Sequence, residues 1–205
     1  MSQDELKVLW KYLNDHLFKG FIWVSFSLAA ALVLFVLKSE EGLRFCVDYW
    51  GLNVITVKNQ YSLPLIKETL DCLCNAVVYT KLDIIAAFNC LWIAEEEEWK
   101  TAFWISYELY DYLVMSFSLA NALSSFQHYI NDTLRDYLNV FCTAYIDDIL
   151  IYSNFWEEHT AYVKKVLERL WITGLQINIS KCEFNVTEVC YLDMIITTDS
   201  ICMDP

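Results

Sequence analysis

The stretch Tyr145-Ile146-Asp147-Asp148-Ile149-Leu150-Ile151-Tyr152-Ser153 holds two adjacent carboxylates between apolar, β-rich runs. This pattern predicts a strand, a tight turn and a second strand, with Asp147 and Asp148 at the turn. Two carboxylates so close together repel each other and raise a pKa unless a cation neutralises them. Hard oxygen ligands suit magnesium, so a metal site is one interpretation. Ordinary turn chemistry is the other, since aspartate is common in hairpins.

A third carboxylate, Asp83, ends the β-rich run 77–82 and has apolar neighbours on both sides. An ionised carboxylate on an interior strand is costly unless it is paired or bound to a metal. If this strand lies beside the first stretch, Asp83 and Asp147 can share two metal ions. That arrangement suits in-line nucleotidyl transfer, with one ion activating a 3′-hydroxyl and the other stabilising the leaving pyrophosphate. The alternative is a strand-end aspartate that faces solvent.

The remaining pattern mixes helical and extended segments. Ser2 and Glu5 form a capping box that predicts a helix at the N-terminal end of the sequence. Helical stripes follow at 126–138 and 163–171, and strands are predicted at 32–37 and 43–48. Because strands and helices do not alternate as regular βαβ units, the predicted fold class is α+β.

Composition narrows the class of protein. Hydrophobic residues make up 57% and charged residues 20%, which excludes a disordered chain. The net charge of −13 argues against a simple basic nucleic-acid-binding patch. The 8 cysteines show no CxxC pair, and the first residues resemble a polar amphipathic helix rather than a secretion signal. We therefore expect an intracellular protein that is not secreted and has free thiols.

Residues 21–37 carry no charged side chain. Their length is at the lower limit for a membrane-spanning helix, so a one-span membrane protein is one interpretation. The other, which we favour, is a buried loop followed by a strand. A continuous helix over 21–37 would favour the membrane interpretation.

An ordered set of motifs gives the chain a family resemblance. The motifs are LRFCVDY at 43–49, GLN at 51–53, YTKLD at 79–83, WKTAF at 99–103, YIDDILIYS at 145–153 and SKCEF at 180–184. Together they resemble the reverse transcriptase of gypsy-type long-terminal-repeat retrotransposons over residues 5–205. The resemblance implies a right-hand polymerase fold with an antiparallel palm sheet. It places the fingers at roughly 1–76 and 95–120, places the palm at roughly 77–94 and 121–205, and leaves out thumb and ribonuclease H.

The resemblance also implies roles for individual residues. The catalytic carboxylates and metal ligands are Asp83, Asp147 and Asp148. The predicted nucleotide-binding residues are Arg44 and Lys38, which grip the triphosphate, Phe117, which packs under the nucleotide, and Lys181, which helps protonate pyrophosphate. Phe88 matches the aromatic steric gate, whose ring fills the space that a ribose 2′-hydroxyl needs. The primer grip falls at Tyr191, Leu192, Asp193 and Met194.

The function implied by the resemblance is RNA-directed DNA polymerisation. Its cofactors are two Mg²⁺ ions, with Mn²⁺ as a substitute. Its substrates are deoxynucleoside triphosphates and an RNA or DNA template with a DNA primer. Intact relatives carry thumb, ribonuclease H and integrase in the same polyprotein, and no membrane is involved. The alternatives are a catalytically inactive remnant that keeps the fold and, third, the one-span membrane protein.

Several positions depart from the family pattern. Trp50 and Gln60 replace arginine, Ser62, Ser116 and Leu123 replace proline, and Ser118 and Asp193 replace glycine. Each change is reachable by one C-to-T or G-to-A transition, a bias that also fits 4 Gly, 2 Pro and 8 Trp in the whole chain. Losing glycine from a tight turn can force a residue with a β-carbon to positive φ. We predict a decaying element altered by cytosine-deamination-type mutation; the alternative is a divergent, working lineage.

Overall fold

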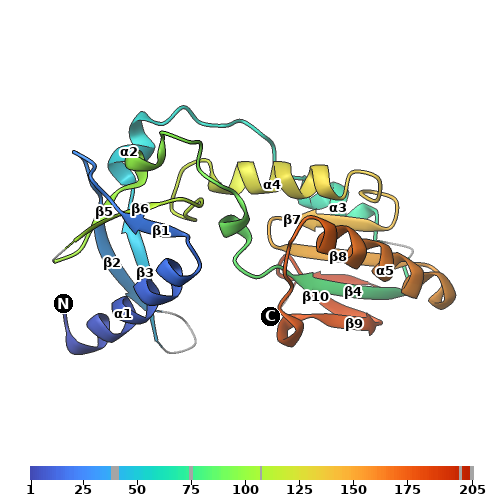
Figure 1. The fold of residues 1–205 in the computed structure, drawn as a ribbon. Coiled ribbons are helices and arrows are strands. Elements are labelled where there is room, and N and C mark those ends of the chain that lie inside the picture. Colours follow the sequence, from blue (N-terminus) through green and yellow to red (C-terminus); the bar gives the residue numbers. More distant parts are fainter. Residues whose placement is uncertain (38–41, 74–75, 107, 199, 204–205) are drawn as a thin grey trace. The chain divides into compact units, whose positions relative to one another are not determined.

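A computed structural model describes residues 1–37, 42–73, 76–106, 108–198 and 200–203 of this chain (Figure 1). The chain divides into two compact units. The first contains residues 1–58 and 88–122, and the second contains 59–87 and 123–205. Both units combine helices with antiparallel strands, as the α+β prediction requires.

The first unit packs a helix against two small antiparallel sheets, β1-β6-β5 and β2-β3. Helix α1 begins with the predicted capping box, in which the Ser2 hydroxyl accepts from the Glu5 N–H and the Glu5 carboxylate accepts from the Ser2 N–H. Its buried face, Leu9 and Leu13, joins a core that includes Phe103. The elements are α1 (Gln3–Phe18), β1 (Ile22–Val24), β2 (Leu32–Leu37), β3 (Leu43–Asp48), α2 (Trp50–Ile55), η1 (Ala87–Cys90), η2 (Glu98–Thr101), β5 (Phe103–Trp104) and β6 (Leu109–Tyr112).

Residues 21–37 do not form a continuous helix. Strand β1 pairs with β6, and strand β2 pairs with β3 after an intervening loop. No helix in the described part of the chain is both long and apolar enough to cross a membrane. The preferred interpretation is therefore confirmed as to loop and strand. The expected burial is wrong, because only Ile22 and Ser25 of this segment are buried, whereas Phe26 and Leu28 are almost fully exposed.

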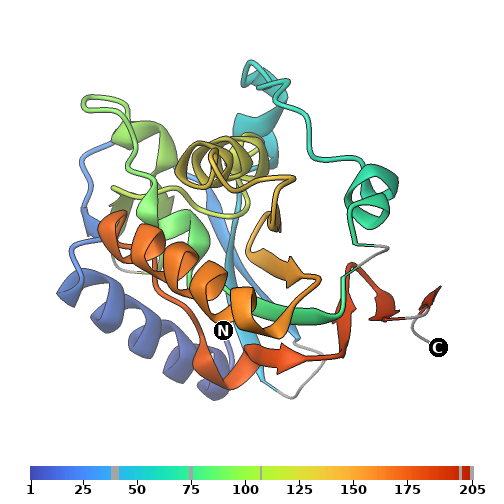
Figure 2. The ribbon, with the colours of Figure 1, turned by 90° about the vertical axis from the view of Figure 1, so that its right-hand side faces the viewer.

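The second unit is built on the antiparallel sheet β7-β8-β4-β9, with a smaller sheet β10-β11-β12. Helix α5 packs on β8 and β4 (Figures 1 and 2). The elements are α3 (Ile66–Asp71), β4 (Val78–Asp83), α4 (Ala122–Thr133), β7 (Cys142–Tyr145), β8 (Asp148–Ser153), α5 (Trp156–Ile172), η3 (Ile179–Lys181), β9 (Glu183–Val186), β10 (Glu188–Tyr191), β11 (Met194–Thr197) and β12 (Ile201–Met203).

The boundaries of the two units differ from the ranges predicted for fingers and palm. Residues 59–76, assigned to the fingers from sequence, lie in the second unit, where Leu73 joins its core. Residues 88–94, assigned to the palm, lie in the first unit, because the Ile93 N–H donates to the Leu113 carbonyl at 2.8 Å. These contacts link distant parts of the sequence, so the local pattern does not reveal them.

A buried histidine ties three elements of the second unit together. His159 on α5 is 1% exposed. Its Nε2 lies 2.8 Å from the Thr80 hydroxyl on β4, and its Nδ1 lies 2.9 Å from the Ser153 hydroxyl on β8. The Ser153 hydroxyl donates to the Phe155 carbonyl, so it accepts from His159 Nδ1–H and leaves Nε2 to accept from Thr80. This network satisfies a neutral imidazole, and burial lowers the His159 pKa.

We expect the free energy of unfolding to fall as the pH drops below about 6.5, the ordinary histidine value. The native state favours neutral His159, so the stability is present above the unfolded pKa and is lost as the pH falls towards the lower folded pKa. His159→Gln should reduce this pH dependence, measured by urea unfolding at pH 7 and pH 5. His128→Gln changes an exposed ring stacked on Tyr61 and should leave the dependence unchanged. If both variants reduced the pH dependence equally, the assignment of that dependence to His159 would be contradicted.

Candidate active site

The predicted carboxylates meet at one edge of the main sheet of the second unit. Asp83 is the last residue of β4, and Asp148, the first of β8, lies directly opposite it in the antiparallel register. Asp147 lies in the turn between β7 and β8, and its carbonyl accepts from the Ile84 N–H at 2.9 Å. The expectation of neighbouring antiparallel strands is confirmed for Asp83 and Asp148, whereas Asp147 lies in the turn that precedes β8. That the carboxylates of Asp83 and Asp147 share a metal stays a prediction.

Two lysines lie against these carboxylates. Lys81 Nζ is 3.7 Å from Asp148 Oδ1, and Lys181 Nζ is 3.5 Å from Asp83 Oδ2. Burial raises the pKa of Asp148, and the carboxylates of Asp147 and Asp83 raise it further, whereas Lys81 opposes the rise. Negative charge therefore accumulates at this edge and is only partly balanced by the chain's own cations.

The carboxylates do not form a closed metal cage. Among the described residues, no three His, Cys, Asp or Glu side chains are arranged to hold a metal ion. Asp83 and Asp148 face lysines instead, while Asp147 is exposed. Mg²⁺ is commonly bound by one or two carboxylates together with substrate phosphates, so the oxygen donors of Asp83 and Asp147 suit that ion.

The turn that carries Asp147 has a strained backbone and is held by hydrogen bonds from a side chain of helix α4. Ile146 has φ 54°, an unfavourable value for a β-branched residue. Its N–H donates to Gln127 Oε1 at 2.8 Å, and Gln127 Nε2 donates to the Ala144 carbonyl at 3.0 Å. Gln127, on α4, is fully buried. The side chain of Gln127 thus fixes the backbone on both sides of Tyr145.

A second hairpin lies next to the carboxylate turn. Strands β10 and β11 are joined by Leu192 and Asp193, with φ 55° and 59°, the geometry of a type I′ turn. Lys81 Nζ donates to the Cys190 carbonyl at 2.9 Å, so one lysine contacts both Asp148 and this hairpin. The residues that line the pocket between the two turns are Lys81, Tyr145, Ile146, Asp147, Asp148, Cys190, Leu192 and Asp193. The predicted primer-grip segment, residues 191–194, thus borders the carboxylates.

Sequence reasoning missed Lys81 and Gln127. Lys81 has a visible signal, because it is the one charged residue within an otherwise apolar or hydroxylated run that ends at Asp83. Gln127 has almost none, because a single glutamine beside the apolar stripe of a helix is common. Both act through contacts with residues distant in sequence.

Three other predicted nucleotide-binding residues lie in the first unit. Arg44 is exposed on β3, and Phe88 is part of η1. Phe117 is 46% exposed in the loop after β6, between Ser116 and Ser118, whose hydroxyl oxygens are 3.1 Å apart. Lys38 lies outside the described residues.

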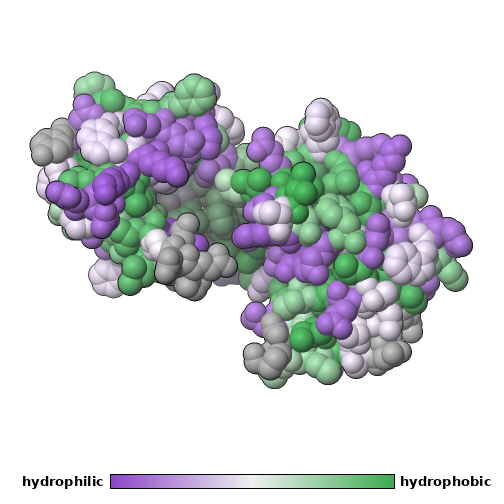
Figure 3. All heavy atoms as spheres, turned by 90° about the horizontal axis from the view of Figure 1, so that it is seen from below, coloured by the Kyte–Doolittle hydropathy of each residue, from purple (hydrophilic) through white to green (hydrophobic). Residues whose placement is uncertain are grey.

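The departures from the family pattern have different structural consequences. Asp193 does stand at positive φ, where glycine is favoured, but Ser118 does not. The expectation of backbone strain after loss of glycine therefore applies at 193 and fails at 118. Trp50 is 76% exposed at the first turn of α2. Figure 3 shows further apolar side chains at the surface of each unit.

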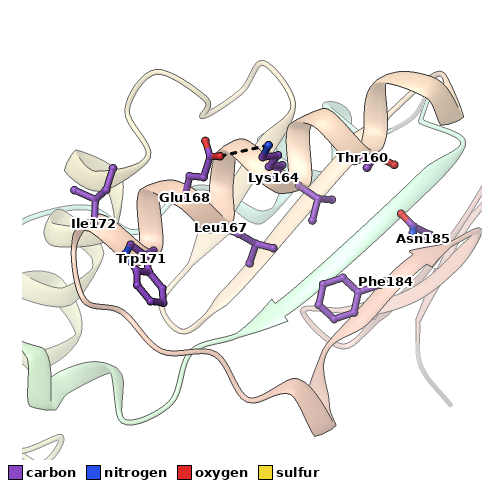
Figure 4. A pocket seen from close by; sticks show the side chains of 9 residues that line it. Thr160, Lys164, Leu167, Glu168, Trp171, Ile172, Phe184 and Asn185 are labelled. Atoms are coloured by element: carbon purple, nitrogen blue, oxygen red, sulfur yellow. Dashed lines mark ion pairs between the residues drawn. The ribbon is translucent and has the colours of Figure 1, made fainter.

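A groove elsewhere on the second unit has different chemistry. It lies between α5 and β9 and has the apolar walls Leu167, Trp171 and Phe184 (Figure 4). Its charged residues, Lys164 and Glu168, pair with each other at 3.8 Å. It has no carboxylate cluster, so the candidate active site is the edge formed by Asp83, Asp147 and Asp148.

An antiparallel sheet that presents aspartates from two neighbouring strands, beside a tight hairpin, agrees with the right-hand polymerase fold that the sequence motifs imply. A family model described as reverse transcriptase (RNA-dependent DNA polymerase) matches residues 36–196, and the chain belongs to that family. Its members are nucleotidyltransferases.

Known proteins similar to this chain include transposon polyproteins of Schizosaccharomyces pombe. The chain is 37% identical to the Transposon Tf2-3 polyprotein over 180 residues, and 36% identical to the Tf2-7 polyprotein over a segment of the same length. Each alignment covers 88% of this chain and 14% of the polyprotein. The chain therefore spans a small part of the length of these relatives.

Solved structures with the same fold include foamy viral protease-reverse transcriptases. One, in complex with an RNA/DNA hybrid, has a TM-score of 0.89 at 19% identity and covers 99% of this chain and 27% of its own. Another, in complex with double-stranded DNA, has a TM-score of 0.84 at 21% identity and covers 93% of this chain and 33% of its own. At these identities the likeness establishes the fold.

Proposed function

We propose that this chain is the fingers and palm part of an RNA-directed DNA polymerase from a gypsy-type retrotransposon polyprotein. The observation that carries the proposal is the register that sets Asp83 opposite Asp148, with Asp147 in the adjoining turn. The first compact unit corresponds to fingers and the second to palm. The template is RNA or DNA with a DNA primer, and thumb, ribonuclease H and integrase belong to the rest of the polyprotein.

Asp83 and Asp147 are the residues that would hold two divalent ions, Mg²⁺ or Mn²⁺, with Asp148 contributing negative charge beside them. When bound, such ions neutralise charge on phosphoryl oxygens and lower the pKa of the attacking hydroxyl. The role of the chain is to position the carboxylates, and it does so through the strand register and through Gln127 under the turn. Lys181, 3.5 Å from Asp83, supplies a cation where the leaving pyrophosphate needs one.

The remaining assignments concern the nucleotide and the primer. Arg44 and Lys38 would bind the triphosphate, Phe117 would pack under the nucleotide, and Phe88 would exclude the ribose 2′-hydroxyl. The hairpin that contains residues 191–194 would hold the primer end, which its position beside the carboxylate turn supports.

Free cysteines such as Cys72 and Cys142 support an intracellular location.

A second candidate function is an inactive remnant that keeps the fold. Leu192 and Asp193 both occupy positive φ in a turn that glycine and asparagine favour. The net charge of −13 also disfavours phosphate binding, which supplies most non-specific affinity for nucleic acid. We propose that the domain has decayed through cytosine-deamination-type mutation and has little activity.

The turn can be tested apart from catalysis. Asp193→Gly should raise the free energy of unfolding by about 1 kcal/mol, because it removes the β-carbon penalty at positive φ. Urea unfolding of the variant measures the gain. Asn185→Gly at φ 53° is the matched control in another turn and should gain less, since asparagine tolerates that conformation. Unchanged stability in all variants would remove the strain argument.

The experiment that tests the proposed function compares the present sequence with a restored one. The restored protein carries Trp50→Arg, Ser116→Pro, Ser118→Gly and Asp193→Gly, and both proteins receive the same thumb from an active relative. Magnesium-dependent extension of a DNA primer on an RNA template is measured. We expect the restored protein to extend the primer and the present sequence to fail. Equal extension would overturn the decay proposal, and no extension by the restored protein would count against the polymerase proposal.

A further inference from the structure

A buried carboxylate in the first unit lacks a hydrogen-bond partner. Asp111 on β6 is 5% exposed, and its Oδ1 is buried with no hydrogen-bond partner in the described part of the chain. Its Oδ2 accepts a long hydrogen bond of 3.3 Å from the Trp23 indole N–H. Leaving a buried carboxylate oxygen unpaired is costly, more so than for a neutral acceptor. This atom therefore marks a place where a donor is missing.

Asp111 is one of the residues that line an aromatic pocket. Trp23, Phe26, Trp99 and Asp111 line it, together with Val24, Ser27 and Leu28. The Trp23 and Trp99 side chains are each about half exposed, and Phe26 is 95% exposed. The Ser27 hydroxyl donates to the Trp99 carbonyl at 2.9 Å, which holds the loop against η2. The pocket thus combines three aromatic side chains with one acidic residue in its lining.

The pocket's charge and geometry select one kind of ligand. A planar guanidinium can stack on an indole and donate two parallel N–H bonds to a carboxylate, whereas an ammonium is a compact point charge. The nearby ammonium of Lys100 already pairs with Glu97. We infer that the Asp111 pocket is a binding site for the guanidinium group of an arginine side chain.

The arginine has two conceivable sources with the same chemistry. One is a second polypeptide that presents an arginine to the pocket. The other is position 23 itself, because Trp23 lies directly opposite Asp111 in the β1–β6 register and an arginine there would reach the carboxylate from the neighbouring strand. Arginine-to-tryptophan is one of the exchanges that a C-to-T bias produces. The site's existence does not depend on polymerase activity.

Binding is tested on the full chain with ethylguanidinium, with its neutral isostere ethylurea as the matched ligand control at equal ionic strength. We expect ethylguanidinium at millimolar concentration to raise the thermal midpoint saturably, by a few degrees, and ethylurea to have no effect. Saturation-transfer NMR of the ligand's ethyl protons gives a second readout that does not depend on stability. Asp111→Asn should abolish both signals. Asp4→Asn, which removes an exposed carboxylate from the same unit, should leave them unchanged.

Trp23→Arg separates the two sources. If the variant has a raised thermal midpoint and no longer binds ethylguanidinium, the arginine belongs at position 23. If it has a lowered midpoint while the unaltered chain binds ethylguanidinium, Trp23 is part of a site for another polypeptide's arginine. The inference is overturned if ethylguanidinium gives no saturable signal with the unaltered chain, or if Asp111→Asn binds it equally well.

Discussion

Asp147→Asn is expected to reduce magnesium-dependent primer extension by the restored, thumb-bearing protein by about a thousandfold. The asparagine keeps the size of the side chain but removes the negative charge that a divalent ion requires. Asp147 holds its place through its backbone carbonyl, which accepts from the Ile84 N–H, so the turn should survive the substitution. Single-nucleotide addition to a DNA primer on an RNA template, at saturating Mg²⁺, measures the effect.

The matched control is Asp132→Asn. Asp132 is an exposed aspartate at the end of α4 that pairs with Arg135, so its loss removes one negative charge from the same unit without touching the candidate site. It should leave the rate within about twofold, because surface ion pairs contribute little. A comparable loss in both variants would point to destabilisation. Full activity of Asp147→Asn would remove Asp147 from the catalytic set.

Phe88→Val is expected to raise ribonucleotide incorporation relative to deoxynucleotide by about a hundredfold in the restored protein. The reason is steric: the proposed role of the Phe88 ring is to fill the volume that a 2′-hydroxyl needs, and valine leaves that volume open. Phe88→Ala should act in the same direction. The ratio of kcat/KM values for matched ribo- and deoxynucleotides is the measurement.

Phe18→Val serves as the control for this substitution. Phe18 is 91% exposed at the end of α1 in the same unit, so the same loss of ring volume should leave sugar selectivity unchanged. If Phe88→Val and Phe88→Ala keep the selectivity of the parent while they still extend a primer, Phe88 is not the gate. The assignment rests on its spacing from Asp83 and is independent of the metal assignment.

Much of the candidate site could be predicted from short segments. The 145–153 stretch predicted a strand, a turn with two aspartates and a second strand, and the structure has β7, the turn and β8 there. Such features are local, because a turn and its flanking strands are encoded by residues that follow one another. The unit boundaries were less predictable, since residues 59–76 belong with the second unit through packing of Leu73 against distant strands.

By itself, then, the sequence determined the capping box of α1, the carboxylate-bearing turn and, through its ordered motifs, the family. Only the tertiary structure decided which distant groups meet: Lys81 with Asp148, Gln127 with Ile146, and Trp23 with Asp111. The physical reason is the separation in sequence between the residues that interact. Caps and turns depend on hydrogen bonds between near neighbours, whereas these pairs depend on strand register and helix packing. Many sequences satisfy the same local pattern while pairing different residues.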